Sequence, residues 1–260
     1  MTLADVDAAL DCPREVTAHY LVAQCDHATL AAAMRAAGVV ADALVVDAPY
    51  SARTHEGHAA GLVGERSDID YSTWTEGDAI AFVGAWHALT RGWIVSLTDH
   101  VLAPAWERAY LAAYRYAFSP LACVETGSRV RMLGDGPSQW ATWAMVARPR
   151  TREWATWGTL PGAYVGASAP KAVTGGKPAW LMRALVRDYS RPDDVVCDPC
   201  AGGGSTLVAA VELGRLAIGC EPDPERYAVA VKMLTRARRP LPGLIAPRTE
   251  QIVMGGLSDE

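Results

Sequence analysis

Two stretches of the chain carry residue types that suit group-transfer chemistry. The first, Asp47, Ala48, Pro49 and Tyr50, directly follows the apolar run 43–46. A carboxylate from Asp47 and the main-chain carbonyl of Ala48 could accept both hydrogens of an amino group, and Tyr50 could stack on a planar ring. The same four residues also fit an ordinary turn at a strand end, because Asp and Pro are common turn residues.

The second stretch is a glycine-rich turn at 198–204, which follows the apolar run 195–197. Such a turn lets the backbone approach a ligand beyond the carboxyl ends of parallel strands. The next predicted strand, 215–220, ends at Glu221, whose carboxylate can accept hydrogen bonds from both ribose hydroxyls. The turn lacks the Lys and Ser/Thr of a P-loop and the G-x-G-x-x-G spacing of a dinucleotide site. The pattern therefore favours an adenosine-containing cofactor with no required phosphate, although glycines alone also fit a structural turn.

The elements that must position these residues alternate between helix and strand. Helices are predicted over 28–37, 79–89, 105–118 and 180–189, and strands over 43–46, 92–98, 120–125, 140–147, 195–198 and 215–220. Thr75 and Asp78 have the spacing of a capping box, and Pro104 suits the first turn of a helix. This order predicts an α/β fold with a doubly wound, mainly parallel sheet and helices on both faces. We expect one domain over 1–260, with loops at 51–75 and 149–178 and a tail at 245–260.

Composition limits the class of protein. The chain has 260 residues, 50% of them hydrophobic, and a net charge of -5, which favours a folded protein whose surface is not broadly cationic. No run reaches the roughly 20 apolar residues of a membrane span, so we expect a cytoplasmic protein with no membrane contact. Six irregularly spaced cysteines indicate reduced thiols. The pair Cys197 and Cys200 has C-x-x-C spacing, which redox or metal sites share, but both residues are predicted to pack.

Residues 175–234 resemble the carboxyl-terminal part of the DNA amino-methyltransferases, in the class whose catalytic motif precedes the S-adenosylmethionine motif. The resemblance rests on the Lys177-Pro178 pair, the DP-x-AG-x-GST turn, the LGR-x-x-IG strand and the Glu and Tyr that follow. It implies a Rossmann-like methyltransferase sheet of permuted motif order and S-adenosyl-L-methionine as the cofactor. The residues that it assigns to the cofactor are Lys177, Asp198, Pro199, Cys200, Ala201, Gly202, Gly204, Ser205, Thr206 and Glu221. Cys200 stands where the family usually has phenylalanine.

The same resemblance implies an upstream Asp-Pro-Pro-Tyr motif, which Asp47, Ala48, Pro49 and Tyr50 match with Ala48 in place of the first proline. Alanine still supplies the carbonyl but loses the rigidity that aims it. Asp in the first position resembles the adenine-modifying members more than the cytosine-modifying ones. We therefore expect methylation of the 6-amino group of adenine in DNA after base flipping. The alternatives are the cytosine amine, RNA or a modified base, and a cofactor-binding partner module without catalysis.

Several residues have less specific patterns. Arg53, Thr54, His55 and His58 are predicted to contact the substrate, because their loop leaves the catalytic strand end; solvated loop residues are the alternative, and no metal is expected. Asp99 and His100 end another strand and could line the pocket. Two basic clusters could hold phosphates or form a solvated face. They consist of Arg148, Arg150 and Arg152, and of Arg236, Arg238, Arg239 and Arg248. Trp154, Trp157 and Tyr164 could stack on bases or pack under a loop.

The expected partners follow from the resemblance. DNA is the expected macromolecule, and the two loops 51–75 and 149–178 are the candidate target-recognition elements. Family members often pair, so a homodimer is a further expectation, and a restriction endonuclease is a candidate partner.

Overall fold

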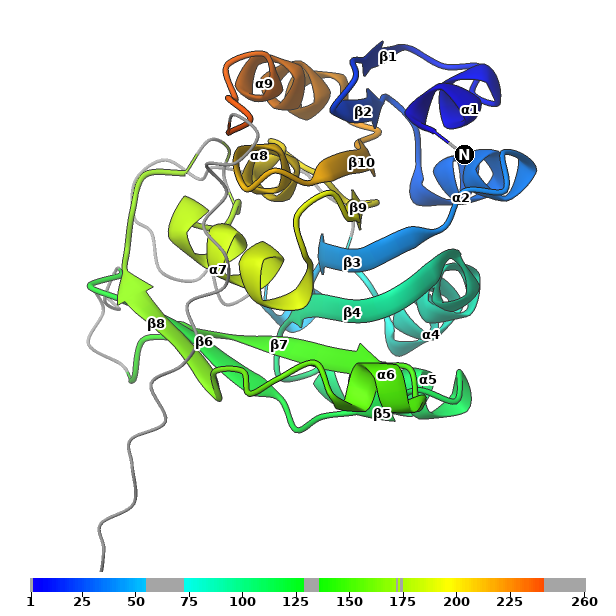
Figure 1. The fold of residues 1–260 in the computed structure, drawn as a ribbon. Helices are drawn as coiled ribbons and strands as arrows, with labels where there is room; N and C mark the ends of the chain where they lie inside the picture. The colour runs from blue at the N-terminus through cyan, green and yellow to red at the C-terminus, as the bar shows by residue number, and fades with distance from the viewer. Residues whose placement is uncertain (1, 55–72, 129–135, 172, 174, 241–260) are drawn as a thin grey trace, which may run out of the picture.

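A computed structural model describes residues 2–54, 73–128, 136–171, 173 and 175–240 (Figure 1). The strands are β1 (Arg14–Val16), β2 (Tyr20–Ala23), β3 (Ala41–Asp47), β4 (Thr90–Thr98), β5 (Tyr116–Ala117), β6 (Leu121–Thr126), β7 (Ala141–Arg148), β8 (Ala163–Ala167), β9 (Val195–Asp198) and β10 (Leu216–Cys220). The helices are α1 (Leu3–Ala8), α2 (His27–Ala36), α4 (Glu76–Trp86), the 3-10 helix η1 (His87–Leu89), α5 (Ala103–Ala112), α6 (Arg152–Ala155), α7 (Ala179–Tyr189), α8 (Ser205–Glu212) and α9 (Pro224–Leu234).

The ten strands form one mixed sheet in the order β1-β2-β10-β9-β3-β4-β7-β6-β8, with β5 beside β7. Its centre, from β2 to β4, is parallel, and β1, β7, β6 and β5 add antiparallel pairs at the two sides. The chain runs outward from β3 to β4 in one direction and from β9 to β10 in the other. This reversal of strand order between β3 and β9 is the switch point at which parallel sheets bind ligands. The predicted doubly wound, mainly parallel fold is confirmed.

Helices cover both faces of the sheet (Figure 1). On one face, α2, α4 and α5 contribute large buried side chains such as Met34, Trp86 and Trp106. On the other face, α7, α8 and α9 contribute a second apolar cluster that includes Leu185 and Leu207. Two such layers fix the strand ends on which the functional residues lie. Among the described residues, no helix combines the length and the apolar character needed to cross a bilayer.

The capping box ahead of α4 is confirmed, but the predicted helix over 105–118 is too long. The backbone N–H of Asp78 donates to Thr75 Oγ1 at 3.3 Å, and the N–H of Thr75 donates to Asp78 Oδ2 at 2.8 Å. Helix α5 ends at Ala112 because Tyr114 takes a positive φ of 57° and the guanidinium of Arg115 turns inward. Arg115 donates to the carbonyls of His87, Thr90 and Gly92 and is only 5% exposed.

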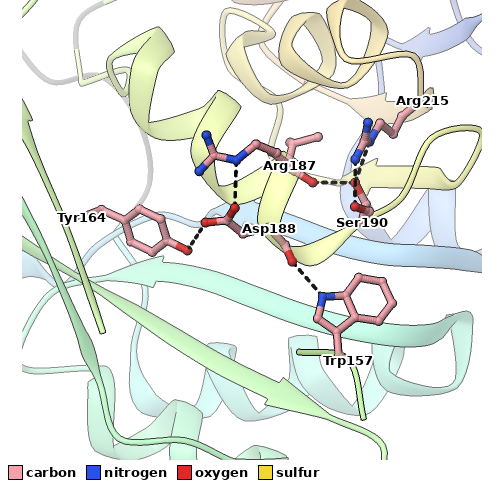
Figure 2. Close-up of polar contacts among 7 residues, drawn as sticks. Trp157, Tyr164, Arg187, Asp188, Ser190 and Arg215 are labelled. Atoms are coloured by element: carbon pink, nitrogen blue, oxygen red, sulfur yellow. Dashed lines mark hydrogen bonds and ion pairs between the residues drawn. The ribbon is translucent and has the colours of Figure 1, made fainter. Parts of the chain in front are cut away.

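The prediction of a loop over 149–178 is wrong in part, because the segment contains α6 and β8, and β8 pairs with β6. The segment is tied to α7 (Figure 2). The indole N–H of Trp157 donates to the carbonyl of Asp188 at 2.9 Å, and the hydroxyl of Tyr164 donates to its carboxylate at 3.0 Å. Trp154 stacks on Trp157, with ring centroids 5.3 Å apart. Trp154, Trp157 and Tyr164 therefore pack against the rest of the protein, which is the alternative to base stacking that the sequence left open.

Candidate functional site

Both predicted motifs lie at the same edge of the sheet. Strand β3 pairs in parallel with β9, with Ala43 opposite Val196 and Leu44 opposite Cys197. Continuing this register places Asp47, at the end of β3, level with the glycine turn that follows β9. Asp99 follows the neighbouring strand β4, whose Leu97 pairs with Asp47. Three strand ends thus bring their polar residues together at the switch point.

Asp47 is held by two side chains. Its carboxylate accepts from Lys177 Nζ at 2.9 Å and from the hydroxyl of Tyr50 at 3.2 Å. The Lys177 ammonium also lies over the ring of Tyr50, 4.7 Å from its centroid. The Lys177 side chain is 8% exposed, so its charge is balanced by Asp47 in a largely dry environment. The family resemblance assigns Lys177 to the cofactor; the structure places its ammonium beside Asp47 and Tyr50.

Asp99 anchors the chain that leaves the catalytic motif. Its Oδ2 accepts from the N–H and the hydroxyl of Ser51 and from the hydroxyl of Thr54, and its Oδ1 accepts from the N–H groups of Val101 and Leu102. Burial would raise the pKa of Asp99, but these hydrogen bonds outweigh burial and hold the pKa below its ordinary value. The sequence did not predict a role for Ser51, because a serine after the motif has no evident function until the structure shows Asp99 beside it.

The predicted substrate residues are only partly described. Arg53 is exposed, and Thr54 binds Asp99, so a substrate contact for either residue stays a prediction. His55 and His58 lie outside the described residues. The N–H of Trp74 donates to the carbonyl of Tyr50 at 3.0 Å, so the segment between them starts and ends beside the catalytic motif.

His100 lines a hollow of about 390 Å³ beyond the end of β4. The hollow is also lined by Ala103, Pro104, Glu107, Pro120 and Trp143. The residues that line this hollow include none of Asp47–Tyr50 and none of the glycine turn. A place for His100 in the substrate pocket therefore stays a prediction, whereas the Asp99 carboxylate binds Ser51 and Thr54. Within the described part of the chain, no group of three or more His, Cys, Asp and Glu side chains could hold a metal ion.

The glycine turn needs glycine at two positions. Gly204 has a φ of 82°, and a Cβ there would lie 3.1 Å from Ala230 of α9. Gly202 has a φ of 52°, which other residues rarely adopt. A Cβ at Gly202 would meet no atom within 4 Å, so open space lies over this part of the turn. The turn thus combines a close approach to α9 with an open face toward the site.

Glu221 closes the turn from the end of β10. Its carboxylate accepts from the N–H of Gly202 at 2.9 Å and from the N–H of Asp223 at 3.1 Å. Glu221 is 7% exposed, and burial raises its pKa. Its own N–H donates to the carbonyl of Ala23 on β2 at 3.0 Å. The sequence missed β2, a run of only four residues, and therefore missed this support.

The remaining turn residues lie where the sequence placed them. Pro199, Ala201 and Thr206 are buried, whereas Cys200 and Ser205 are half-buried. Cys197 lies in the buried strand β9, and burial raises its pKa, which agrees with the packing interpretation of the C-x-x-C pair. Contacts of these residues with a cofactor remain predictions.

Asp198 is the most perturbed carboxyl of the site. It is 1% exposed, and burial raises its pKa to about 7, with further contributions from the negative charges of Asp47 and Glu221. Its Oδ1 accepts from the N–H of Cys200 at 3.1 Å. Lys177 neutralises Asp47, which leaves two acidic groups facing the turn. Such a site favours a ligand that brings positive charge.

We expect Asp198→Asn to stabilise the protein, and to do so more at pH 8 than at pH 5. A folded-state pKa raised above the unfolded value lowers stability as the pH rises from about 4 to about 7. Removing the ionisable group abolishes that loss, so the gain should be larger at pH 8 by about 3 kcal/mol. Urea unfolding at both pH values measures it, with the exposed Glu76→Gln as the control. A gain of equal size at the two pH values would contradict the argument from burial.

Some arginines of the two basic clusters make contacts within the protein. Arg148 lies over the ring of Tyr116 at 4.7 Å, and Arg150 lies over Tyr114 at 5.4 Å. Arg239 pairs with Asp193 and donates to the carbonyl of Arg215. Arg248 lies outside the described residues. Phosphate binding by either cluster stays a prediction.

Known proteins resemble this chain in the region that contains the glycine turn and Glu221. A family model described as DNA methylase matches residues 141–232. The type II methyltransferase M.HindIII of Haemophilus influenzae is 43% identical over 58 residues, which cover 22% of this chain and 19% of the relative. The type II methyltransferase M1.MboII of Moraxella bovis is 41% identical over 49 residues, which cover 19% of each protein. The resemblance to the DNA amino-methyltransferases is confirmed. In these matches the chain spans about a fifth of the length of the methyltransferase relatives.

Solved methyltransferase structures share the fold over most of the chain. The M1.HpyAVI complex with S-adenosylmethionine superposes with a TM-score of 0.64 at 16% identity, over 83% of this chain and 98% of that one. The cytosine-N4-specific PvuII DNA methyltransferase gives a TM-score of 0.56 at 12% identity, over 84% of this chain and 87% of that one. At these identities the likeness concerns the fold.

Proposed function

We propose that this protein is an S-adenosylmethionine-dependent DNA methyltransferase that modifies an exocyclic amino group, the 6-amino group of adenine. The observation that carries the proposal is the parallel pairing of β3 with β9, which places Asp47 beside the glycine turn. The family match over 141–232 supports the cofactor half. The aspartate at position 47 supports adenine over cytosine.

The residues of the turn fit S-adenosylmethionine. Glu221 supplies a carboxylate for the ribose hydroxyls, and the open face at Gly202 leaves room beside it. Asp198 and Glu221 form an acidic environment that suits a cofactor with a sulfonium and an ammonium group. When bound, S-adenosylmethionine supplies a methyl group on a sulfonium, an electrophile with a neutral leaving group.

Asp47 and Ala48 act on the base amine. The lone pair of an aromatic amine is delocalised into the ring, which makes the nitrogen a poor nucleophile. Hydrogen bonds from its two N–H groups to the Asp47 carboxylate and the Ala48 carbonyl favour a pyramidal, nucleophilic nitrogen. Transfer in line then depends mainly on positioning. Afterwards the nitrogen carries one extra proton, which the Asp47 carboxylate is placed to accept.

Lys177 and Tyr50 prepare Asp47 for that task. The ammonium of Lys177 fixes the carboxylate and compensates its charge while no amine is bound. An incoming amine takes over part of this hydrogen bonding, and the ring of Tyr50 offers a surface for stacking of the flipped base. The exchange keeps a half-buried carboxylate hydrogen-bonded throughout, which avoids the cost of an unpaired charge.

The test uses purified protein, isotopically labelled S-adenosylmethionine, and pooled DNA and RNA, followed by digestion to nucleosides and mass spectrometry. The proposal expects labelled 6-methyladenine from DNA. Labelled N4-methylcytosine would keep the enzyme class and overturn the base. Label in RNA alone would overturn DNA as the substrate. Cofactor binding without any methylated nucleoside would overturn the activity and favour the non-catalytic module.

A further inference from the structure

Two cysteines face each other at the open end of the β1–β2 hairpin. The hairpin is antiparallel, with Arg14 opposite Ala23 and Glu15 opposite Val22. The N–H of Gln24 donates to the carbonyl of Pro13 at 2.7 Å, which extends the same register by one pair. The next pair in that register is Cys12 and Cys25.

The position of this pair in the ladder suits a disulfide. Hydrogen-bonded and non-hydrogen-bonded pairs alternate in an antiparallel ladder, and the 13–24 pair is hydrogen-bonded. Continued by one more pair beyond the two strands, the register makes Cys12 and Cys25 a non-hydrogen-bonded pair, and Cα atoms in such pairs typically lie about 4.5 Å apart. That separation falls within the range that a disulfide spans without backbone movement. The Cys25 side chain also contributes to the raised pKa of Cys12, which agrees with two thiols that lie close together.

The two thiols differ from the buried ones and from each other. Cys12 and Cys25 are both half-buried, whereas Cys123, Cys197 and Cys220 are buried. Hydrogen bonds with Cys220 and Cys12 lower the pKa of Cys25, and the N–H of Leu30 in α2 adds to this effect. Burial raises the pKa of Cys12 to about 11. Cys25 is the thiol whose pKa is lowered, which makes it the candidate for the attacking thiolate, with Cys12 as its resolving partner.

We propose that Cys12 and Cys25 form a reversible intramolecular disulfide when the protein encounters hydrogen peroxide. The Cys25 thiolate attacks a peroxide oxygen, the O–O bond breaks, and hydroxide leaves as water after protonation, which gives a sulfenic acid. Cys12 then attacks Cys25 Sγ, the S–O bond breaks, and a second water leaves. Two thiols are oxidised and one peroxide is reduced to two waters. Thiol–disulfide exchange with a reductant reverses the reaction.

The cross-link would close next to the cofactor turn. Cys25 lies two residues beyond Ala23, whose carbonyl accepts from the N–H of Glu221. Strand β2 also pairs along β10, with Ala23 opposite Cys220. The disulfide would therefore tie the two ends of the hairpin to each other, next to strand β10, which precedes Glu221.

The experiment exposes the full-length wild-type protein to hydrogen peroxide, blocks free thiols and maps peptides without reduction by mass spectrometry. We expect one linked peptide pair that joins Cys12 to Cys25 and disappears after dithiothreitol. In Cys12→Ser, the Cys25 sulfenic acid has no resolving partner, so its labelling by dimedone should exceed that of the wild type by roughly tenfold. Cys123→Ser is the matched control, because Cys123 lies on β6 outside the hairpin, and its cross-link should equal that of the wild type.

Three results would overturn the proposal. One is a link between Cys25 and Cys220, whose side chain lowers the pKa of Cys25. Another is recovery of Cys12 and Cys25 as free thiols after peroxide treatment. A third is equal dimedone labelling of Cys25 in the wild type and in Cys12→Ser. All three readouts concern the thiols alone, so the result does not depend on methyl transfer.

Discussion

Asp47→Ala is expected to lower methyl transfer by roughly 10³-fold while the affinity for S-adenosylmethionine changes by less than about threefold. The variant removes the acceptor for the amine hydrogen and the group placed to take the final proton. Lys177 loses its partner, but the other predicted cofactor residues stay in place, because they lie at the end of β9, in the turn before α8, at the start of α8 and directly after β10. Single-turnover rates and cofactor binding measured by calorimetry separate the two effects.

The variant also leaves the Lys177 ammonium without its carboxylate in a place where its side chain is only 8% exposed. We expect a loss of about 1–3 kcal/mol in the free energy of unfolding, which denaturant titration checks. Asp47→Asn keeps an oxygen for Tyr50 and should restore part of this stability without restoring turnover. Glu76→Gln, on the exposed start of α4, should match the wild type in both rate and stability. Wild-type turnover in Asp47→Ala would contradict the proposed mechanism.

The features of the site that the sequence predicts depend on local chemistry. A glycine turn between an apolar run and a helix is specified by neighbouring residues, and its conformation follows from Gly202 and Gly204 with positive φ. The capping box of Thr75 and Asp78 is equally local. The order of strands and helices then determines that both motifs reach the same edge of the sheet. Sequence reasoning works here because each step needs only a few adjacent residues.

The features that the sequence does not predict depend on distant partners. Strand β8 lies in a segment rich in Gly, Pro and Trp, and it forms because β6 offers an edge and Trp180 packs over Gly166. A Cβ at Gly166 would lie 2.6 Å from the Trp180 ring, a contact that no local pattern encodes. The apolar spacing of the sequence predicts a helix that continues beyond Ala112. Helix α5 ends there because the Arg115 guanidinium donates hydrogen bonds to the carbonyls of Thr90 and Gly92 in β4. The role of Asp99 belongs to the same group.

Asp99 shows how a long-range contact supports the catalytic motif. It is 6% exposed, and it joins the end of β4 to Ser51, the residue directly after Tyr50. Five donors converge on its two oxygens, so the chain that leaves the motif is held by one carboxylate. The position of Tyr50 therefore depends on a residue on the neighbouring strand.

Asp99→Ala is accordingly expected to lower the free energy of unfolding by about 3–5 kcal/mol, because it leaves buried N–H groups of Ser51 and Leu102 without an acceptor. Asp78→Ala is the matched control: Asp78 also accepts from a backbone N–H and a hydroxyl, but it is exposed and should cost only about 1 kcal/mol. Urea unfolding of both variants measures the difference. Equal losses would mean that water replaces the Asp99 contacts, and the catalytic motif would then owe its position to β3 and Lys177 alone.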